Sequence, residues 1–216
     1  MSLKSAVKKV AKAISDEVEV IKGNRSKDKT YTSEKSFADD EAAKREFVAA
    51  KERLFDVNAW SDIQGIGTAG FRIHNAAGTP TEHKIVMTGD FIRIDLPGPV
   101  DKYWVEVIDV KEEPDLAEFT VKPTHDPSDF DKPEKTDHFF HEDARSIFRV
   151  QRFGNVLKAM EIGTNEAINN KGEEAGDDAA EHTLVAVNGW AFFQKNQWES
   201  LTKYLVGHEN EQGRIG

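Results

Sequence analysis

The sequence has no cysteine in its 216 residues. That absence excludes disulfide scaffolds, thiol nucleophiles, thiolate-held iron–sulfur clusters and zinc sites built on thiolates. Long apolar runs are missing too: none approaches the roughly 18 residues of a membrane-spanning helix. The first residues also lack the continuous apolar stretch of about 7–15 residues that marks a secretory signal. We therefore predict a cytoplasmic chain with no transmembrane segment.

Positive charge is scarce, since 29 lysines and arginines face 39 acidic residues and the net charge is −10. Such a surface repels the phosphate backbone, so nucleic acid is not an expected partner. The exception is the segment 1–15, which has four lysines and no acid. Its apolar residues recur at helical spacing, which predicts an amphipathic basic helix. The residues we expect to bind a partner are Leu3, Lys4, Val7, Lys8, Lys9, Val10 and Lys12.

Three kinds of surface fit that helix as binding partners: the body of the same chain, an acidic protein, or an anionic lipid surface. The apolar face carries no bulky aromatic anchor, which disfavours the membrane. Residues 23–35 are polar and are interpreted as a connector after a short strand at 18–21. A second helix is predicted from Ser36 or Asp39 onward, because apolar residues keep a 3.6-residue period there. Its inward positions are Ala43, Phe47, Ala50 and Leu54.

From Gly65 onward the apolar period changes to two, which is typical of strands. Two residue pairs, Gly154-Asn155 and Asn188-Gly189, tolerate the positive φ of tight hairpin turns and predict two hairpins. A last helix is expected over 194–206, with Trp198 on its apolar face. Strands are predicted around residues 71–74, 92–96, 103–108 and 119–122.

These patterns predict an α+β fold that is mainly antiparallel β, with N-terminal helices and a packed C-terminal helix. The sheet is expected as a small barrel or a strongly curved sheet. We divide the chain into a basic helix and polar connector, one β-rich domain with two acidic insertions, and a tail. The bounds are 1–36 for the first part, 37–207 for the domain, 123–143 and 163–181 for the insertions, and 208–216 for the tail.

Two clusters have the residue types of metal ligands. His138, His141 and Glu142 lie close in sequence, and an acidic stretch precedes them. The spacing is not the H-E-x-x-H arrangement of zinc hydrolases. The preceding stretch lacks the glycine and the bidentate glutamate of a calcium loop. We prefer a surface loop that Phe139 and Phe140 pin to the core, with no metal and no other cofactor. The preceding acidic stretch contains His125, Asp126, Asp129 and Asp131.

No pattern points to catalysis. The glycines of residues 65–70 match a G-x-G-x-x-G spacing, but they follow a helix and precede a strand, whereas a phosphate loop joins a strand to a helix. Adjacent acids such as Asp39-Asp40 and Glu112-Glu113 point to opposite faces of a strand. A set of aromatic residues is interpreted as core, with a ligand cavity or base stacking as alternatives. The set is Tyr103, Trp104, Phe148, Trp190, Phe192 and Phe193.

Two stretches resemble known folds. Residues 88–99, a Gly-Asp turn followed by an alternating strand, and the apolar strand 103–107 resemble the opening of SH3-like small barrels of the Tudor and KOW kind. This resemblance covers residues 84–124 and implies a binding surface without chemistry. The terminal helix with Trp198, and the helix ending in Phe55-Asp-Val-Asn-Ala-Trp60, are similar to the helix-grip fold of START-like lipid carriers.

Three functions remain open from the sequence. The first is a non-enzymatic structural or adaptor subunit of a larger protein assembly, a homo-oligomer among the options, that contacts protein partners through the basic helix and the long loops. The alternative is a START-like carrier of a small apolar ligand held between the sheet and the terminal helix. The third is a metal-dependent hydrolase that uses the histidine cluster at 138–142.

Overall fold

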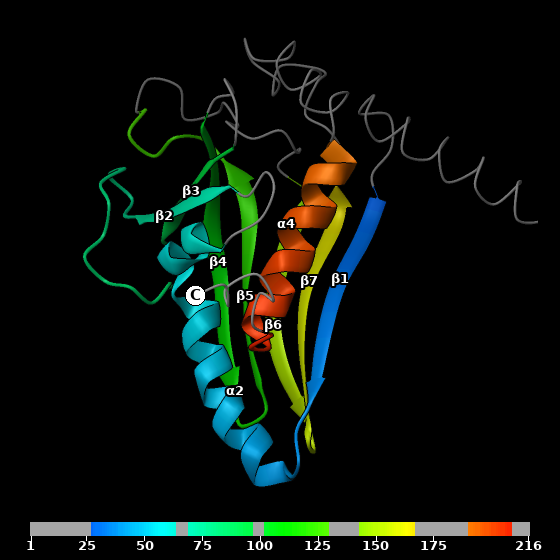
Figure 1. Ribbon diagram of the computed structural model, residues 1–216. Coiled ribbons are helices and arrows are strands. Elements are labelled where there is room, and N and C mark those ends of the chain that lie inside the picture. Colours follow the sequence, from blue (N-terminus) through cyan, green and yellow to red (C-terminus); the bar gives the residue numbers. More distant parts are fainter. Residues whose placement is uncertain (1–26, 64–68, 97–101, 130–142, 167–189, 209–216) are drawn as a thin grey trace, which may run out of the picture.

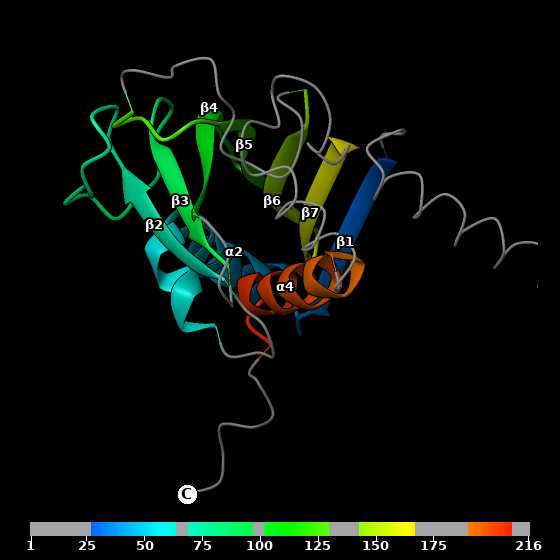
Figure 2. The ribbon, with the colours of Figure 1, turned by 90° about the horizontal axis from the view of Figure 1, so that it is seen from above.

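The computed structural model describes residues 27–63, 69–96, 102–129, 143–166 and 190–208 (Figure 1). Seven strands form one sheet in the order β1-β7-β6-β5-β4-β3-β2, and every neighbouring pair is antiparallel. β1 and β2 are its two edges, so the sheet is open and curved rather than a closed barrel (Figure 2). The bounds are β1 Lys27–Ser36, β2 Gly70–His74, β3 Phe91–Asp95, β4 Lys102–Glu113, β5 Leu116–Thr124, β6 Arg145–Phe153 and β7 Val156–Glu166.

The helices lie on one face of the sheet, as Figures 1 and 2 show. They are α2 (Asp40–Phe55), the short 3₁₀ helix η1 (Val57–Asp62) and α4 (Trp190–Leu205). α4 crosses β1 and β7, while α2 packs on β6, β7 and α4. None of these helices is long and apolar enough to cross a membrane. The predicted α+β architecture with a C-terminal helix is therefore confirmed.

The 3.6-residue apolar period predicted for α2 is confirmed. Asp39 caps its first turn by accepting a hydrogen bond from the Ala42 backbone N–H at 2.7 Å. The predicted inward residues, spaced at three and four positions, are all buried against the sheet. These residues are Ala43, Phe47, Ala50 and Leu54.

Side chains alternate between two faces of the sheet. We call the face under α2 and α4 the inner face and the opposite one the outer face. Tyr103, Val105 and Val107 of β4 lie on the inner face and Trp104 on the outer face, as the alternation predicts. The outer face also carries cross-strand ion pairs, such as Glu118 with Arg149.

The connector predicted at 23–35 is wrong over most of its length. Residues Lys27–Ser36 form β1, which pairs with β7 along its whole length. The strand lacks an apolar alternation because it is an edge strand, whose inward positions are Tyr31, Ser33 and Lys35. Its stability comes from hydrogen bonds to a strand about 130 residues away in sequence, which no local pattern shows.

One of the two predicted hairpins is confirmed. Phe153 pairs with Val156 across the Gly154-Asn155 turn, and Gly154 has a φ of 58°. The other is wrong at its second arm: Trp190 begins α4, so the aromatic run after Asn188-Gly189 is helical. A short aromatic run is compatible with either a strand or a buried helix. Here the run belongs to a helix of 16 residues, whose apolar period continues beyond it.

Several predictions lie outside the described residues. They are the basic helix of 1–15, the strand at 18–21 and most of the glycine-rich turn at 65–70. The greater part of each acidic insertion also lies outside: the structure describes residues 123–129 and 143 of the first and 163–166 of the second. Residues 84–124 contain β3, β4 and β5, and their resemblance to SH3-like barrels stays a prediction.

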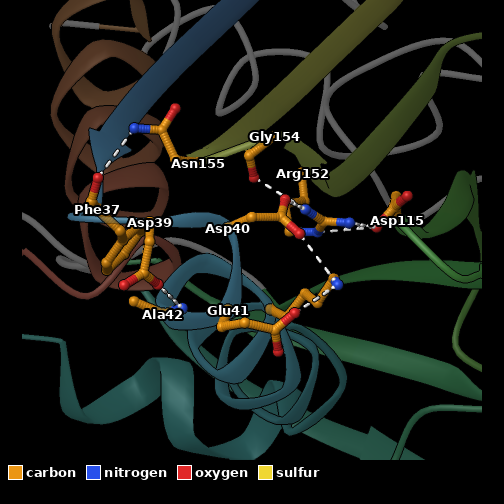
Figure 3. A network of polar contacts seen from close by, with 10 residues as sticks. Phe37, Asp39, Asp40, Glu41, Ala42, Asp115, Arg152, Gly154 and Asn155 are labelled. Atoms are coloured by element: carbon orange, nitrogen blue, oxygen red, sulfur yellow. Dashed lines mark hydrogen bonds and ion pairs between the residues drawn. The ribbon is translucent and has the colours of Figure 1, made fainter.

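A polar network ties the hairpin ends to the start of α2 (Figure 3). The Arg152 guanidinium pairs with the carboxylates of Asp40 and Asp115, and it donates to the Gly154 carbonyl oxygen at 2.9 Å. A hydrogen bond from Lys44, with the charges of Lys44 and Arg152, lowers the pKa of Asp40. The adjacent acids Asp39 and Asp40 thus have structural roles, one as a cap and one in an ion pair.

Candidate functional site

An aromatic cluster fills the middle of the inner face, with Trp60 of η1 at its centre. Its ring centroid lies 5.0 Å from that of Phe148, 5.6 Å from Phe71 and 5.8 Å from Phe119. Trp198 of α4 extends the cluster, with its centroid 5.4 Å from Phe148. Edge and tilted contacts of this kind add to the stability from buried area. The cluster therefore joins η1, three strands and α4 into one wall.

The Trp60 indole has a complete set of contacts. Its Nε1 donates a hydrogen bond to the Arg53 carbonyl oxygen at 2.9 Å, and 1% of the residue is exposed. This tryptophan is a satisfied core residue, which is the ordinary state of a buried polar group.

Gln197 on α4 is completely buried and only half satisfied. Its Oε1 accepts a hydrogen bond from the Ala69 backbone N–H at 2.8 Å. Because a backbone N–H can only donate, this bond fixes the amide orientation and leaves Nε2 as a donor group. Nε2 has no hydrogen-bond partner among the described residues. A buried donor in that state costs about 1–3 kcal/mol, so it marks a place where a partner is expected.

The next residue, Trp198, is half-buried and also has an N–H donor without a partner among the described residues. Its Nε1 is buried and has no hydrogen-bond partner in the described parts of the chain. Both side chains reach the start of β2, since Gln197 bonds to Ala69 and the Trp198 ring lies 6.5 Å from that of Phe71. α4 therefore presents two N–H donors beside an aromatic wall.

A carboxylate lies on the same face. Glu161 of β7 is 1% exposed, and its cross-strand neighbours are Phe148 on β6 and Tyr31 on β1. The other buried acid of the described residues, Asp90, holds a turn by accepting from the Met87 N–H and pairing with His83. Acidic side chains rarely occupy an inner sheet face, because transfer from water disfavours the charged form.

The register places Trp198 at the level of Glu161. The hydroxyl groups of Thr202 and Ser33 lie 2.9 Å apart, which aligns α4 with β1, and Figure 1 shows the two running side by side. Two residues back along β1 is Tyr31, a distance of about 6.6 Å. Four residues back along α4 is Trp198, a rise of about 6 Å. Tyr31, Phe148, Glu161 and Trp198 thus share one part of the inner face.

The C-terminal end of α4 is held firmly over the sheet. Lys35 Nζ donates to the Gly207 carbonyl oxygen at 2.6 Å, and Arg53 donates to the Leu205 carbonyl oxygen at 3.0 Å from Nη2. Cations at this end also complement the helix dipole. Gly207 ends the helix with a φ of 70°. These contacts fix the position from which Gln197 and Trp198 approach the sheet.

A further buried group lies on the other side of the sheet. His74 is 3% exposed on the outer face, and its ring lies 4.8 Å from that of Trp104. Nδ1 is 2.9 Å from the Gly78 carbonyl oxygen, which can only accept, so Nδ1 carries the proton. Burial lowers the pKa of His74, which favours the neutral ring. This residue belongs to the outer face and not to the candidate site.

The predicted site residues divide into three groups. Tyr103 and Phe148 lie on the inner face and Trp104 on the outer face, while Trp190, Phe192 and Phe193 belong to the first turn of α4. The described residues, which include His125, Asp126 and Asp129, hold no group of three ligands placed for a metal. The remaining candidates lie outside the described residues: Leu3, Lys4, Val7, Lys8, Lys9, Val10, Lys12, Asp131, His138, Phe139, Phe140, His141 and Glu142.

Sequence reasoning missed Glu161 and Gln197, although both left a signal. From the Gly154-Asn155 turn, inward positions of β7 run Leu157, Ala159, Glu161, so the acid stands where an apolar residue is expected. Gln197 likewise lies four residues before Leu201 on the apolar side of α4.

No known protein family and no curated protein matches the sequence. Solved structures of similar shape include a hypothetical protein from Helicobacter pylori, with 9% identity, a TM-score of 0.47, and coverage of 87% of this chain and 92% of that one. A major latex-like protein of Panax ginseng has 13% identity, a TM-score of 0.38, and coverage of 74% and 95%. Norcoclaurine synthase of Thalictrum flavum, solved with dopamine and hydroxybenzaldehyde, has 10% identity, a TM-score of 0.40, and coverage of 92% and 94%. Likeness at this level assigns no ligand or activity to the chain.

Proposed function

We propose that the protein binds a small, largely apolar ligand between the inner face and α4. The observation that carries the proposal is the pair of buried N–H donors on α4, Gln197 Nε2 and Trp198 Nε1, beside an aromatic wall. Ligand sites combine apolar walls with a few placed polar groups. An acceptor oxygen on a ligand would complete both donors, and the rings of Phe71, Phe148 and Trp198 would pack on its apolar body.

The proposed function is ligand binding without catalysis. In the described part of the inner face, Glu161 is the only buried acid. The nearest hydroxyl pair, Ser33 with Thr202, is used to join α4 to β1. The assembly-subunit interpretation depends on residues 1–15, which lie outside the described residues, so it stays a prediction.

The test uses N-phenyl-1-naphthylamine, a neutral apolar dye that fluoresces when it leaves water. We expect it to bind the purified protein and to quench tryptophan emission, since the Trp198 ring borders the site. Ser146→Trp should abolish dye binding, because Ser146 is half-buried on the inner face, two residues from Phe148. The control Ile147→Trp, on the outer face of the same strand, should leave it intact.

Circular dichroism is the control for folding, and we expect both variants to give the wild-type spectrum. Dye binding that survives Ser146→Trp, or no dye binding by the folded wild type, would refute the proposal. If ordered water alone satisfies the two donors, the wild type will bind no dye.

A further inference from the structure

We infer that the ligand carries a protonated amine and that Glu161 is the residue that binds it. The inference rests on the proposed function and names the ligand class of the same site. It starts from the position of a carboxylate, 1% exposed, on a face whose other inward β7 residues include Leu157 and Ala159.

The neighbours of Glu161 suit a cation. Its cross-strand partners on the inner face are both aromatic, Phe148 on one side and Tyr31 on the other. Side chains directly opposite each other in antiparallel strands have Cβ atoms about 4.5–5.5 Å apart. Trp198 covers Phe148 from α4. A carboxylate among aromatic rings offers an ammonium group both an ion pair and cation–π contacts.

The same surroundings disfavour other head groups. A carboxylate or phosphate on the ligand would meet the charge of Glu161 in a water-poor place, where like charges repel strongly. A neutral alcohol could donate a hydrogen bond to Glu161 but would gain neither the charge pairing nor the ring contacts. The amine is therefore the head group that this arrangement binds best.

Two lysines of β1 also face inward. Lys35 is engaged with the Gly207 carbonyl oxygen at 2.6 Å. Lys29 lies opposite Gly163, one inward position beyond Glu161, so its ammonium group is the chain's own competitor for that carboxylate. Replacing Lys29 should leave the preference for amines unchanged or increase it.

The experiment measures displacement of N-phenyl-1-naphthylamine by three ligands with the same alkyl body: decylamine, decanol and decanoate. For the wild type we expect decylamine to displace the dye at about tenfold lower concentration than decanol, with decanoate weakest. Glu161→Gln should remove the preference for the amine, and Glu161→Asp, which keeps the charge, should retain part of it. The control Glu118→Gln removes a partly buried acid from the outer face, where it pairs with Arg149, and should leave the order of the three ligands unchanged.

The outcomes separate this inference from the proposed function. If the dye binds and Ser146→Trp blocks it, but decanol or decanoate displaces it as well as decylamine does, the site exists and the amine assignment is wrong. An amine preference that persists in folded Glu161→Gln, or that disappears in Lys29→Gln, also overturns the assignment. Failure of the dye to bind wild type refutes the proposed function itself.

Discussion

The inner face has two halves that differ in the hydrogen bonding of their buried donor groups. In the packed half, apolar residues pack closely and the polar groups around them are hydrogen-bonded. Trp60 Nε1 donates to Arg53, and Thr202 bonds to Ser33. In the polar half, the Glu161 carboxylate is buried, and two N–H donors of α4 have no hydrogen-bond partner among the described residues. The packed half consists of Leu54, Trp60, Phe119, Leu157, Leu201 and Leu205, and the polar half of Tyr31, Glu161, Gln197 and Trp198.

The difference shows which half stabilises the fold and which is available for recognition. Burying an apolar side chain stabilises a protein without any specific partner. Burying a donor or a charge destabilises it unless a partner is present. The two N–H donors of α4 that lack a partner among the described residues lower stability on a scaffold that is otherwise well bonded, which is typical of functional sites. Substitutions in the two halves should therefore change different measurements.

The largest effect is expected in the packed half. Trp60→Ala removes the centre of the aromatic cluster and should lower the free energy of unfolding by about 3–5 kcal/mol. Urea denaturation followed by circular dichroism measures this loss. The exposed position Val48 on α2 provides the control, since Val48→Ala should change the free energy of unfolding by at most about 0.5 kcal/mol. A loss below about 1 kcal/mol in Trp60→Ala would mean that the packed half is not the stabilising core.

The sequence predicted the elements whose information is local. α2 follows from a 3.6-residue apolar period, β4 from alternation, and the β6–β7 hairpin from the turn residues Gly154-Asn155. β1 could not be found this way, because Tyr31, Ser33 and Lys35 become an inward face only through pairing with β7. The start of α4 was missed because four residues around Trp190 fit either a strand or a helix.

The candidate site is less accessible to sequence reasoning. Glu161 and Gln197 each break a local apolar pattern, so their positions could have been marked as unusual. Their meaning depends on contacts distant in sequence: Gln197 is oriented by Ala69, 128 residues away, and Glu161 meets Tyr31 from the opposite end of the chain. Whether a buried donor has an acceptor is a property of the folded chain alone.

The second prediction concerns His74, a buried residue outside the candidate site, and tests whether a buried polar atom without a partner is enough to mark a ligand site. His74 Nε2 on the outer face is also buried without a hydrogen-bond partner among the described residues. Because burial lowers its pKa in the folded state, the unfolded state binds more protons in acid. The free energy of unfolding should therefore fall as the pH drops below about 6.5, the ordinary histidine pKa.

His74→Asn tests this assignment, since asparagine can still donate to the Gly78 carbonyl oxygen and does not titrate in this range. The variant should depend less on pH between about pH 5 and 7 than the wild type. Dye binding should be unchanged, because His74 is on the outer face and has no aromatic wall apart from Trp104. Equal pH dependence in both proteins would contradict a structural role for the neutral ring, and lost dye binding would place His74 in the ligand site.

The smallest change in stability is expected from Trp198→Phe in the polar half. The substitution keeps an aromatic ring against Phe148 and Phe71 and removes the Nε1 donor. A donor without an acceptor contributes nothing favourable in the free protein, so the free energy of unfolding should stay within about 1 kcal/mol of wild type. Ligands that offer an oxygen acceptor to this donor should bind about fivefold to tenfold more weakly.

Two ligands make this last test specific. Decylamine has no acceptor for Nε1, so its affinity should be the same in Trp198→Phe and wild type. A ligand with the amine and an added ether or carbonyl oxygen should bind wild type more tightly than decylamine and lose that advantage in the variant. If Trp198→Phe instead unfolds the protein as easily as Trp60→Ala does, Trp198 belongs to the packed half, and the boundary between the halves lies closer to Gln197.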